Sequence, residues 1–174
     1  MSTLGVVLAG LAAGATSTIE RYRARGYAVR IADVDEAMGV DEALEAVRSA
    51  MDALAGGTVA VVGYGAGGRA AFLAVTRLGA DGAAVFHGTG IGEHLAESSR
   101  AKKPLTFHFG DDDERVPFAE VRAIKGALEG FGTTEIYRYP GARHGFALVG
   151  DPNYDEASAL AAEGRVFAVL DRLG

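Results

Sequence analysis

The sequence predicts an α/β fold in which helices cover both faces of a mostly parallel six-stranded sheet. Short runs rich in β-branched residues alternate along the chain with segments of helical periodicity, a pattern typical of this class. The 174 residues, of which 49% are hydrophobic, suffice for one well-buried domain and are too few for two. We therefore predict a single three-layer α/β/α domain over residues 1–174.

The elements of this fold have their own local signals. Ser17 followed by Glu20 forms a capping box for the first helix. Asp41 precedes apolar residues at helical spacing, and Pro117 opens a later helix with the same periodicity. The last helix covers roughly residues 155–173. The predicted strands are residues 5–9, 28–32, 59–62, 83–86, 105–109 and 134–139.

Composition excludes several classes of function. The net charge of -6 comes from scattered acidic and basic residues, which argues against nucleic acid or an anionic membrane as a partner. The chain has no cysteine and its four histidines lack i, i+4 spacing, so neither a disulfide, a thiolate metal site nor a helical zinc pair is expected. The N-terminal apolar run is short and lacks a basic flank, so we interpret it as a strand and expect a cytoplasmic protein.

In an open α/β sheet, ligands bind beyond the carboxyl ends of the strands. The most informative residues there follow the strand at 59–62, where the sequence Gly63-Tyr64-Gly65-Ala66-Gly67-Gly68 leads into a helix-like segment. A strand, a sharp turn and a helix form the frame of a nucleophile elbow. The central position, which carries serine or cysteine in a hydrolase, is Gly65.

Two later loops carry residues suited to acid-base chemistry. Asp113 follows the predicted strand at 105–109, and His144 follows the one at 134–139. The order of elbow, acid and histidine along the chain is that of α/β-hydrolases, in which the acid orients the histidine as a general base.

These motifs resemble the dienelactone hydrolase family of α/β-hydrolases, from about residue 4 to the end. The family has a G-Y-C-x-G-G elbow, an acid in a G-x-x-D-x-x-V-P loop and a histidine in a G-x-x-H-x-F loop. The resemblance implies an α/β-hydrolase scaffold with an Asp-His pair, no cofactor and a monomer acting on a small molecule. The matching residues are 63–68 at the elbow, Gly110, Asp113, Val116 and Pro117 in the acid loop, and Gly141, His144 and Phe146 in the histidine loop.

The chain also departs from the family pattern. Gly65 stands at the position of the family's cysteine, and residues 10–14 stand where the family has a Q-E-x-x-G stretch. Leu148 stands where the family has an arginine for a substrate carboxylate. The chain begins at what would be the family's third strand. Dienelactone itself is therefore not implied as the substrate.

We expect a hydrolase for a small ester, lactone or related carbonyl compound, with weak, water-mediated or lost activity. His144 would act as the base, with Asp113 as its orienting partner. The backbone N–H of Ala66, with a second amide near Ala12, would hold the oxyanion. Leu11 and Tyr64 complete the predicted substrate site, and Leu11, Thr89, Leu148 and Tyr154 suggest a largely apolar cleft.

Other interpretations stay open. The fold could serve as a non-catalytic binding module, and the absence of cysteine is compatible with either natural loss or deliberate replacement of the nucleophile. Gly63, Gly65 and Gly68 also satisfy G-x-G-x-x-G, and residues 10–14 with Asp33 offer a second arguable dinucleotide site.

Individual residues have simpler interpretations as well. Gly65 could be a turn residue alone, and Asp113 could cap the helix at Pro117. His87 and His108 fit packed strand histidines, with His87 also able to face the pocket, and His94 fits a solvated helix position.

Overall fold

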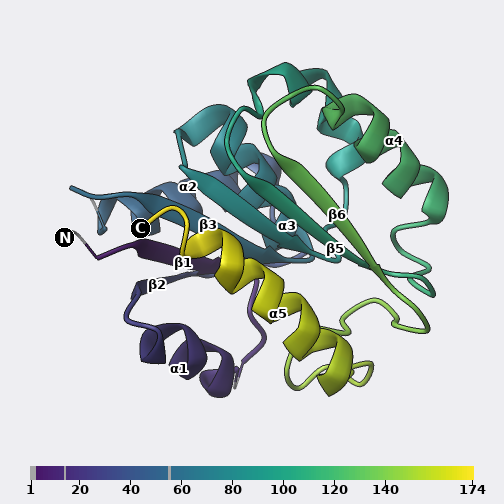
Figure 1. Cartoon of the computed structure of the whole chain (residues 1–174), viewed down its shortest axis with the longest axis horizontal. Coiled ribbons are helices and arrows are strands. Elements are labelled where there is room, and N and C mark those ends of the chain that lie inside the picture. Colours follow the sequence, from purple (N-terminus) through teal and green to yellow (C-terminus); the bar gives the residue numbers. More distant parts are fainter. Residues whose placement is uncertain (1–2, 14, 55) are drawn as a thin grey trace.

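A six-stranded, all-parallel sheet forms the centre of the molecule (Figure 1). The computed structural model describes residues 3–13, 15–54 and 56–174. The strands lie in the order β2-β1-β3-β4-β5-β6, which confirms the predicted sheet. Their bounds differ from the predicted ones by at most two residues: β1 Gly5–Ala9, β2 Ala28–Ala32, β3 Val59–Tyr64, β4 Gly82–Phe86, β5 Leu105–Gly110 and β6 Thr134–Tyr139.

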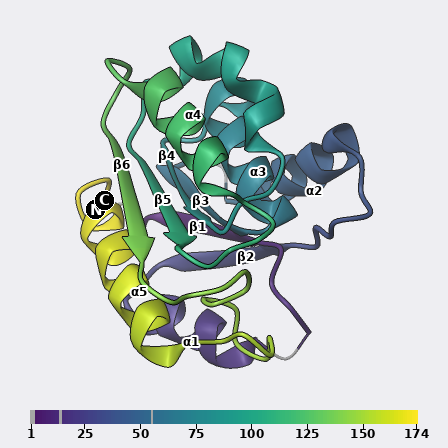
Figure 2. The same ribbon diagram turned by 90° about the vertical axis from the view of Figure 1, so that its right-hand side faces the viewer.

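Helices cover both faces of the sheet and give the three predicted layers. One face carries α1 and α5, and the other carries α2, α3 and α4, as the two perpendicular views in Figures 1 and 2 agree. A π-helical turn, Ala74–Leu78, continues α3, and a 3-10 segment, Ile91–Arg100, follows β4. The helices are α1 Thr16–Ala24, α2 Val40–Asp52, α3 Ala66–Leu73, α4 Phe118–Leu128 and α5 Glu156–Leu170.

The central strands are buried on both faces, which explains their continuous apolar runs. Successive side chains of a strand point to opposite faces, so β1 sends Val7 into the core beneath α2, α3 and α4. Val6 and Leu8 of the same strand enter the second core, beneath α1 and α5. The same alternation places Val61 in the first core and Val62 in the second. The sheet thereby lies between two buried apolar layers.

Helix starts differ from the prediction in one place. The capping box at Ser17 and Glu20 is wrong, because Ala15 is the N-cap residue and no side chain caps α1. Ser17 already lies within the first helical turn, where its hydroxyl cannot cap that end. By contrast, the Asp155 side chain accepts the Ser158 N–H at 3.1 Å and caps α5.

The order of the strands places a topological switch point between β1 and β3. The chain proceeds from β1 outward to β2, then returns to build the rest of the sheet on the other side of β1. Loops after β1 and β3 therefore diverge, and a ligand crevice is expected between them at the carboxyl edge of the sheet. Among the described residues, no helix is long and apolar enough to cross a membrane.

Candidate active site

The turn between β3 and α3 is an elbow that glycines make possible. Gly65 has φ 56° and ψ -122°, a conformation that other residues adopt only with strain. A Cβ at Gly67 would lie 2.3 Å from the Ala9 carbonyl oxygen, and one at Gly63 would lie 1.9 Å from the Gly67 oxygen. The glycines therefore allow α3 to begin in direct backbone contact with β1.

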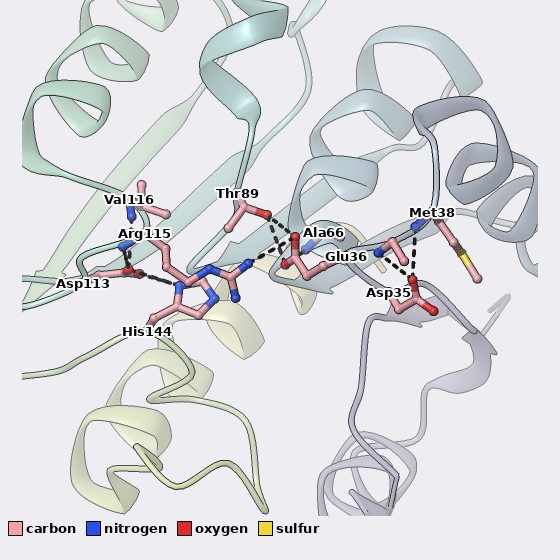
Figure 3. A network of polar contacts seen from close by, with 10 residues as sticks. Asp35, Glu36, Met38, Ala66, Thr89, Asp113, Arg115, Val116 and His144 are labelled. Atoms are coloured by element: carbon pink, nitrogen blue, oxygen red, sulfur yellow. Dashed lines mark hydrogen bonds and ion pairs between the residues drawn. The ribbon is translucent and has the colours of Figure 1, made fainter.

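Asp113 and His144 lie together beside this elbow (Figure 3). His144 Nδ1 is 2.9 Å from Asp113 Oδ2 and 3.1 Å from Oδ1. Asp113 Oδ1 also accepts the backbone N–H groups of Arg115 and Val116, at 2.8 and 3.1 Å. The carboxylate thus closes its own loop and holds the imidazole ring. With Nδ1–H donating to Asp113, the lone pair of the other nitrogen, Nε2, is left as the base.

The surroundings of Asp113 favour its ionised form. Burial by itself raises the pKa of this carboxyl, but the hydrogen bond and charge of His144 lower it, and so do the two backbone donors. The net effect is a pKa below the ordinary value of 3.8. Asp113 is therefore an anion at neutral pH and stabilises a positive charge on His144.

A third side chain, Glu36 from the loop after β2, occupies the elbow itself. Its Oε1 accepts the Ala66 N–H at 2.9 Å, and it lies 2.7 Å from the position that a Cβ of residue 65 would take. The hydroxyl of Thr89 lies 3.1 Å from Oε1 and 3.0 Å from Oε2. A carboxylate oxygen from a distant loop thus fills the space where an elbow side chain would begin.

His87 forms the floor of the site in an unusual conformation. Its φ of 39° is the one positive value at a non-glycine residue among the described residues. The side chain is 2% exposed, and neither ring nitrogen has a hydrogen-bond partner in the described part of the chain. Its ring packs edge to face on His144, with centroids 4.9 Å apart. Burial, followed by the nearby His144 charge, lowers the pKa of His87 to about 3, so this imidazole is neutral.

These groups line a cavity of about 260 Å³ at the carboxyl edge of the sheet. Arg115 extends over it toward Glu36, with Nη2 3.6 Å from Oε2 (Figure 3). All six post-strand loops contribute to the wall, which consists of residues 10–12, 34–36, 64–66, His87, Arg115, His144, Gly145, Leu148 and Asp151. A larger hollow of about 820 Å³ lies along α4 and β6, away from this site.

The sequence profile of the dienelactone hydrolase family matches residues 9–173. The chain belongs to this family. A carboxymethylenebutenolidase of Pseudomonas putida is 34% identical over 152 residues, covering 84% of this chain and 63% of the relative. A carboxymethylenebutenolidase of Cupriavidus pinatubonensis is 34% identical over 120 residues, covering 67% of this chain and 50% of the relative. The chain thus spans less than two thirds of the length of these relatives.

Solved structures agree on the fold. A candidate dienelactone hydrolase from Klebsiella pneumoniae has a TM-score of 0.81 at 21% identity, covering 97% of this chain and 86% of that one. An esterase from Pyrococcus furiosus has a TM-score of 0.77 at 15% identity, covering 99% of this chain and 83% of that one. At these identities the likeness concerns the α/β-hydrolase scaffold alone, which confirms the predicted fold class.

The structure brings most of the predicted site residues of this family member together. Asp113 lies behind His144, which lines the cavity. The other predicted residues line the cavity as well: Gly65, Ala66, Ala12, Leu11 and Tyr64. Tyr64 contributes to the wall, but its ring stacks on Phe86 in the core, with centroids 4.8 Å apart. The roles of these residues in a reaction stay predictions.

The cleft is largely apolar, as predicted, and Leu11 and Leu148 line it. The prediction did not include its charged side chains, Glu36, Arg115 and Asp151, which line it together with two histidines. Sequence reasoning missed Glu36, although it follows a predicted strand by four residues and so lies at the edge where ligands bind. Arg115 was likewise overlooked, two residues after Asp113 in the acid loop.

The structure decides between the alternative interpretations of Asp113, His108 and His94. Asp113 does not cap α4, whose N-cap residue Pro117 has no side-chain cap. His108 is a packed strand histidine, as predicted, and its Nδ1 lies 2.9 Å from the Tyr139 hydroxyl. The solvated position predicted for His94 is wrong, because its side chain, within the 3-10 segment, is only 15% exposed.

The G-x-G-x-x-G glycines have a packing reason that needs no nucleotide. A Cβ at Gly68 would lie 2.9 Å from the Gly88 Cα, as α3 crosses close over the end of β4. Together with the backbone contacts of Gly63 and Gly67, this explains why glycine occupies these three positions. The alternative glycine pair at residues 10 and 14 includes a position outside the described residues.

Proposed function

We propose that the chain is a hydrolase of small carboxylic esters or lactones. The observation that carries the proposal is the Asp113–His144 pair, with its 2.9 Å contact, next to a backbone elbow in a cavity formed by all six post-strand loops. Relatives named carboxymethylenebutenolidase and dienelactone hydrolase point to a lactone as one substrate class. The cavity of about 260 Å³ suits a small molecule.

Because Gly65 offers no nucleophile, the attacking group in this proposal is water. His144 Nε2 accepts the proton of the water as its oxygen adds to the substrate carbonyl carbon, and Asp113 stabilises the imidazolium. The oxyanion that forms is held by the Ala66 N–H, with a second amide near Ala12. Collapse of this intermediate expels the alcohol, which takes the proton back from His144.

Glu36 makes this reaction slow. Its carboxylate is already bound to the Ala66 N–H, so the substrate carbonyl must displace a charged hydrogen bond of 2.9 Å before the oxyanion can form there. Weak ester hydrolysis is therefore the expected activity of the native chain.

The proposal is tested by turnover of a panel of activated esters and small lactones. The native chain is compared with His144→Ala and Gly65→Cys, and His94→Ala is the control for loss of a histidine outside the cavity. Turnover that falls to the buffer rate in His144→Ala and persists in His94→Ala supports the hydrolase. Turnover that His144→Ala leaves unchanged contradicts it.

A non-catalytic binding module is the second candidate. It is favoured by one observation, which is that the Ala66 N–H at the elbow is already satisfied by a side chain of the same chain. This candidate predicts no turnover by the native chain, and activity appearing only in Gly65→Cys. Clean hydrolysis that depends on His144 would refute it.

A further inference from the structure

Glu36 has the geometry of a reacting group rather than a spectator. One oxygen, Oε1, is fixed by the Ala66 N–H, while Oε2 lies 3.0 Å from the Thr89 hydroxyl and 3.6 Å from Arg115 Nη2. The side chain is 41% exposed and lines the cavity, so a small molecule can reach Oε2. The cavity is also lined by the buried imidazole of His87, whose ring nitrogens have no hydrogen-bond partner in the described part of the chain. The pocket therefore contains a second polar side chain that a bound molecule could contact.

The fixed oxygen distinguishes between two kinds of chemistry. In acyl transfer the substrate carbonyl needs the Ala66 N–H, which Oε1 already holds. In alkyl transfer the carboxylate itself becomes the ester, and Oε1 keeps the same hydrogen bond in the resting state, in the ester and in the oxyanion formed when that ester is hydrolysed. The resident contact of 2.9 Å is therefore preorganised for the second reaction.

We propose that Glu36 is the nucleophile of a hydrolytic displacement on small 2-haloalkanoates. This activity goes beyond ester hydrolysis and shares with it the His144 base. Arg115 supplies the specificity: its side chain is 53% exposed, and its ion pair with Glu36 is long at 3.6 Å. A substrate carboxylate can take over this guanidinium by a bidentate pair, which frees Oε2 to attack the adjacent carbon.

In the first step, a lone pair on Glu36 Oε2 forms a bond to the substrate α-carbon. The carbon–halogen bond breaks, and the halide departs with the bonding electrons. The product is a neutral ester between Glu36 and the 2-hydroxyalkanoate skeleton. A halide leaves as a stable anion, so this step needs no proton donor.

In the second step, water adds to Glu36 Cδ and gives its proton to His144 Nε2, whose charge Asp113 stabilises. The Ala66 N–H holds the resulting negative charge on Oε1. The intermediate collapses and expels the alkoxide, which takes the proton from His144. The carboxylic acid left on Glu36 loses its proton to solvent, so that haloalkanoate and water yield hydroxyalkanoate, halide and one proton.

The probe is 2-chloropropionate, with chloride release as the measured product. The native chain should release chloride repeatedly, and Glu36→Gln should reduce release to the buffer rate. Glu42→Gln, an exposed glutamate in the first turn of α2, is the matched control and should retain native release. Equal release by Glu36→Gln and the native chain would overturn the proposal.

His144→Gln separates the two steps. It should release one equivalent of chloride and then stop, with one carboxyethyl group retained on the peptide that contains Glu36, as read by mass spectrometry.

A single turnover by the native chain in ¹⁸O-water should yield lactate with unlabelled hydroxyl oxygen, because that oxygen comes from Glu36. Labelled lactate would mean direct attack by water and would overturn the nucleophile.

The ester panel distinguishes failure of this inference from failure of the proposed function. Ester turnover that depends on His144, with no chloride release by the native chain, overturns the inference and leaves the ester hydrolase standing. Chloride release together with a carboxyethyl group retained on Glu36 in His144→Gln, but no ester turnover, supports the inference and contradicts the proposed ester hydrolase.

Discussion

Glu36 Oε1 accepts the backbone N–H of Ala66 at 2.9 Å, although the two residues lie 30 positions apart and belong to different loops. This contact joins the end of β2 to the start of α3 across the loop that follows β1. In the ester hydrolysis that we propose, the Ala66 N–H is the donor on which the oxyanion would depend, so Glu36 competes with the substrate for it.

Removing the Glu36 carboxylate should therefore increase ester hydrolysis. In Glu36→Ala the Ala66 N–H is free for a substrate carbonyl, and we expect kcat/KM for activated esters to rise by up to about a hundredfold, the lower end of what one oxyanion donor contributes. Steady-state kinetics on one ester measures this, with Glu42→Ala as the control. A fall in kcat/KM in Glu36→Ala would mean that the carboxylate assists acyl transfer instead of obstructing it.

A side chain at residue 65 should be destabilising for two separable reasons. Gly65→Ala must adopt a φ near 56°, and its Cβ would meet Glu36 Oε1 at 2.7 Å. We expect the free energy of unfolding to fall by about 1–3 kcal/mol. Gly26→Ala is the control for backbone strain alone, because Gly26 has φ 87° with open space around its missing Cβ.

The contribution of Glu36 to this cost follows from a double-mutant cycle. In a Glu36→Ala background, Gly65→Ala should cost less than in the native chain, since the steric conflict is gone and the backbone strain remains. Urea denaturation of the four proteins gives the coupling. Strictly additive losses would show that Glu36 does not occupy the elbow in solution.

The ionised carboxylate of Asp113 should stabilise the fold, and this stabilisation should be lost in acid. Its pKa is below the ordinary value of 3.8 in the folded chain, so its stabilisation is full above that value and is lost as pH falls through the folded pKa. In Asp113→Asn, the free energy of unfolding should depend less on pH between about pH 5 and about pH 2. Asp112→Asn, an exposed neighbour, is the control. Parallel profiles for Asp113→Asn and the native chain would contradict the depressed pKa.

The same variant should also reduce any turnover that depends on His144. An amide at residue 113 can donate a hydrogen bond to Nδ1, which favours the tautomer in which Nε2 carries the hydrogen and cannot act as a base. We expect kcat to fall by about 10²–10⁴-fold while the fold is retained. Kinetics beside circular dichroism separates this effect from unfolding.

The parts of the site that sequence could predict are those tied to strand ends and motif order. Asp113 and His144 each follow a strand whose apolar run is plain, and parallel strands bring their carboxyl ends to one edge. The same rule places Glu36 at this edge, but it does not predict the contact of its side chain with the Ala66 N–H, 30 positions away in another loop. No periodic pattern in the sequence indicates such a side-chain contact between two loops.

Helix starts were less predictable than strands for a similar reason. Ser17 and Glu20 have the spacing of a capping box, but Ala15 is buried and α1 begins after it, which moves Ser17 into the first turn. Packing of Ala15 thus overrides a local capping preference worth about 1 kcal/mol. In contrast, Asp155 caps α5, and its own N–H donates to the Phe146 carbonyl, which holds the residue in place before the helix.

The two buried histidines should make the protein lose stability in mild acid. Burial lowers the pKa of both His87 and His108 to about 3, whereas a histidine in the unfolded chain has an ordinary pKa of 6.5. The unfolded chain therefore binds more protons below this value, and stability falls as pH drops toward 3, by up to about 1.4 kcal/mol per pH unit for each histidine. His87→Asn, which tolerates the positive φ, should remove one share of this slope. His94→Asn is the control for loss of a histidine outside the cavity. Thermal unfolding followed from about pH 7 to about pH 4 gives the slopes, and identical slopes for His87→Asn and the native chain would mean that His87 finds a proton-accepting partner in solution.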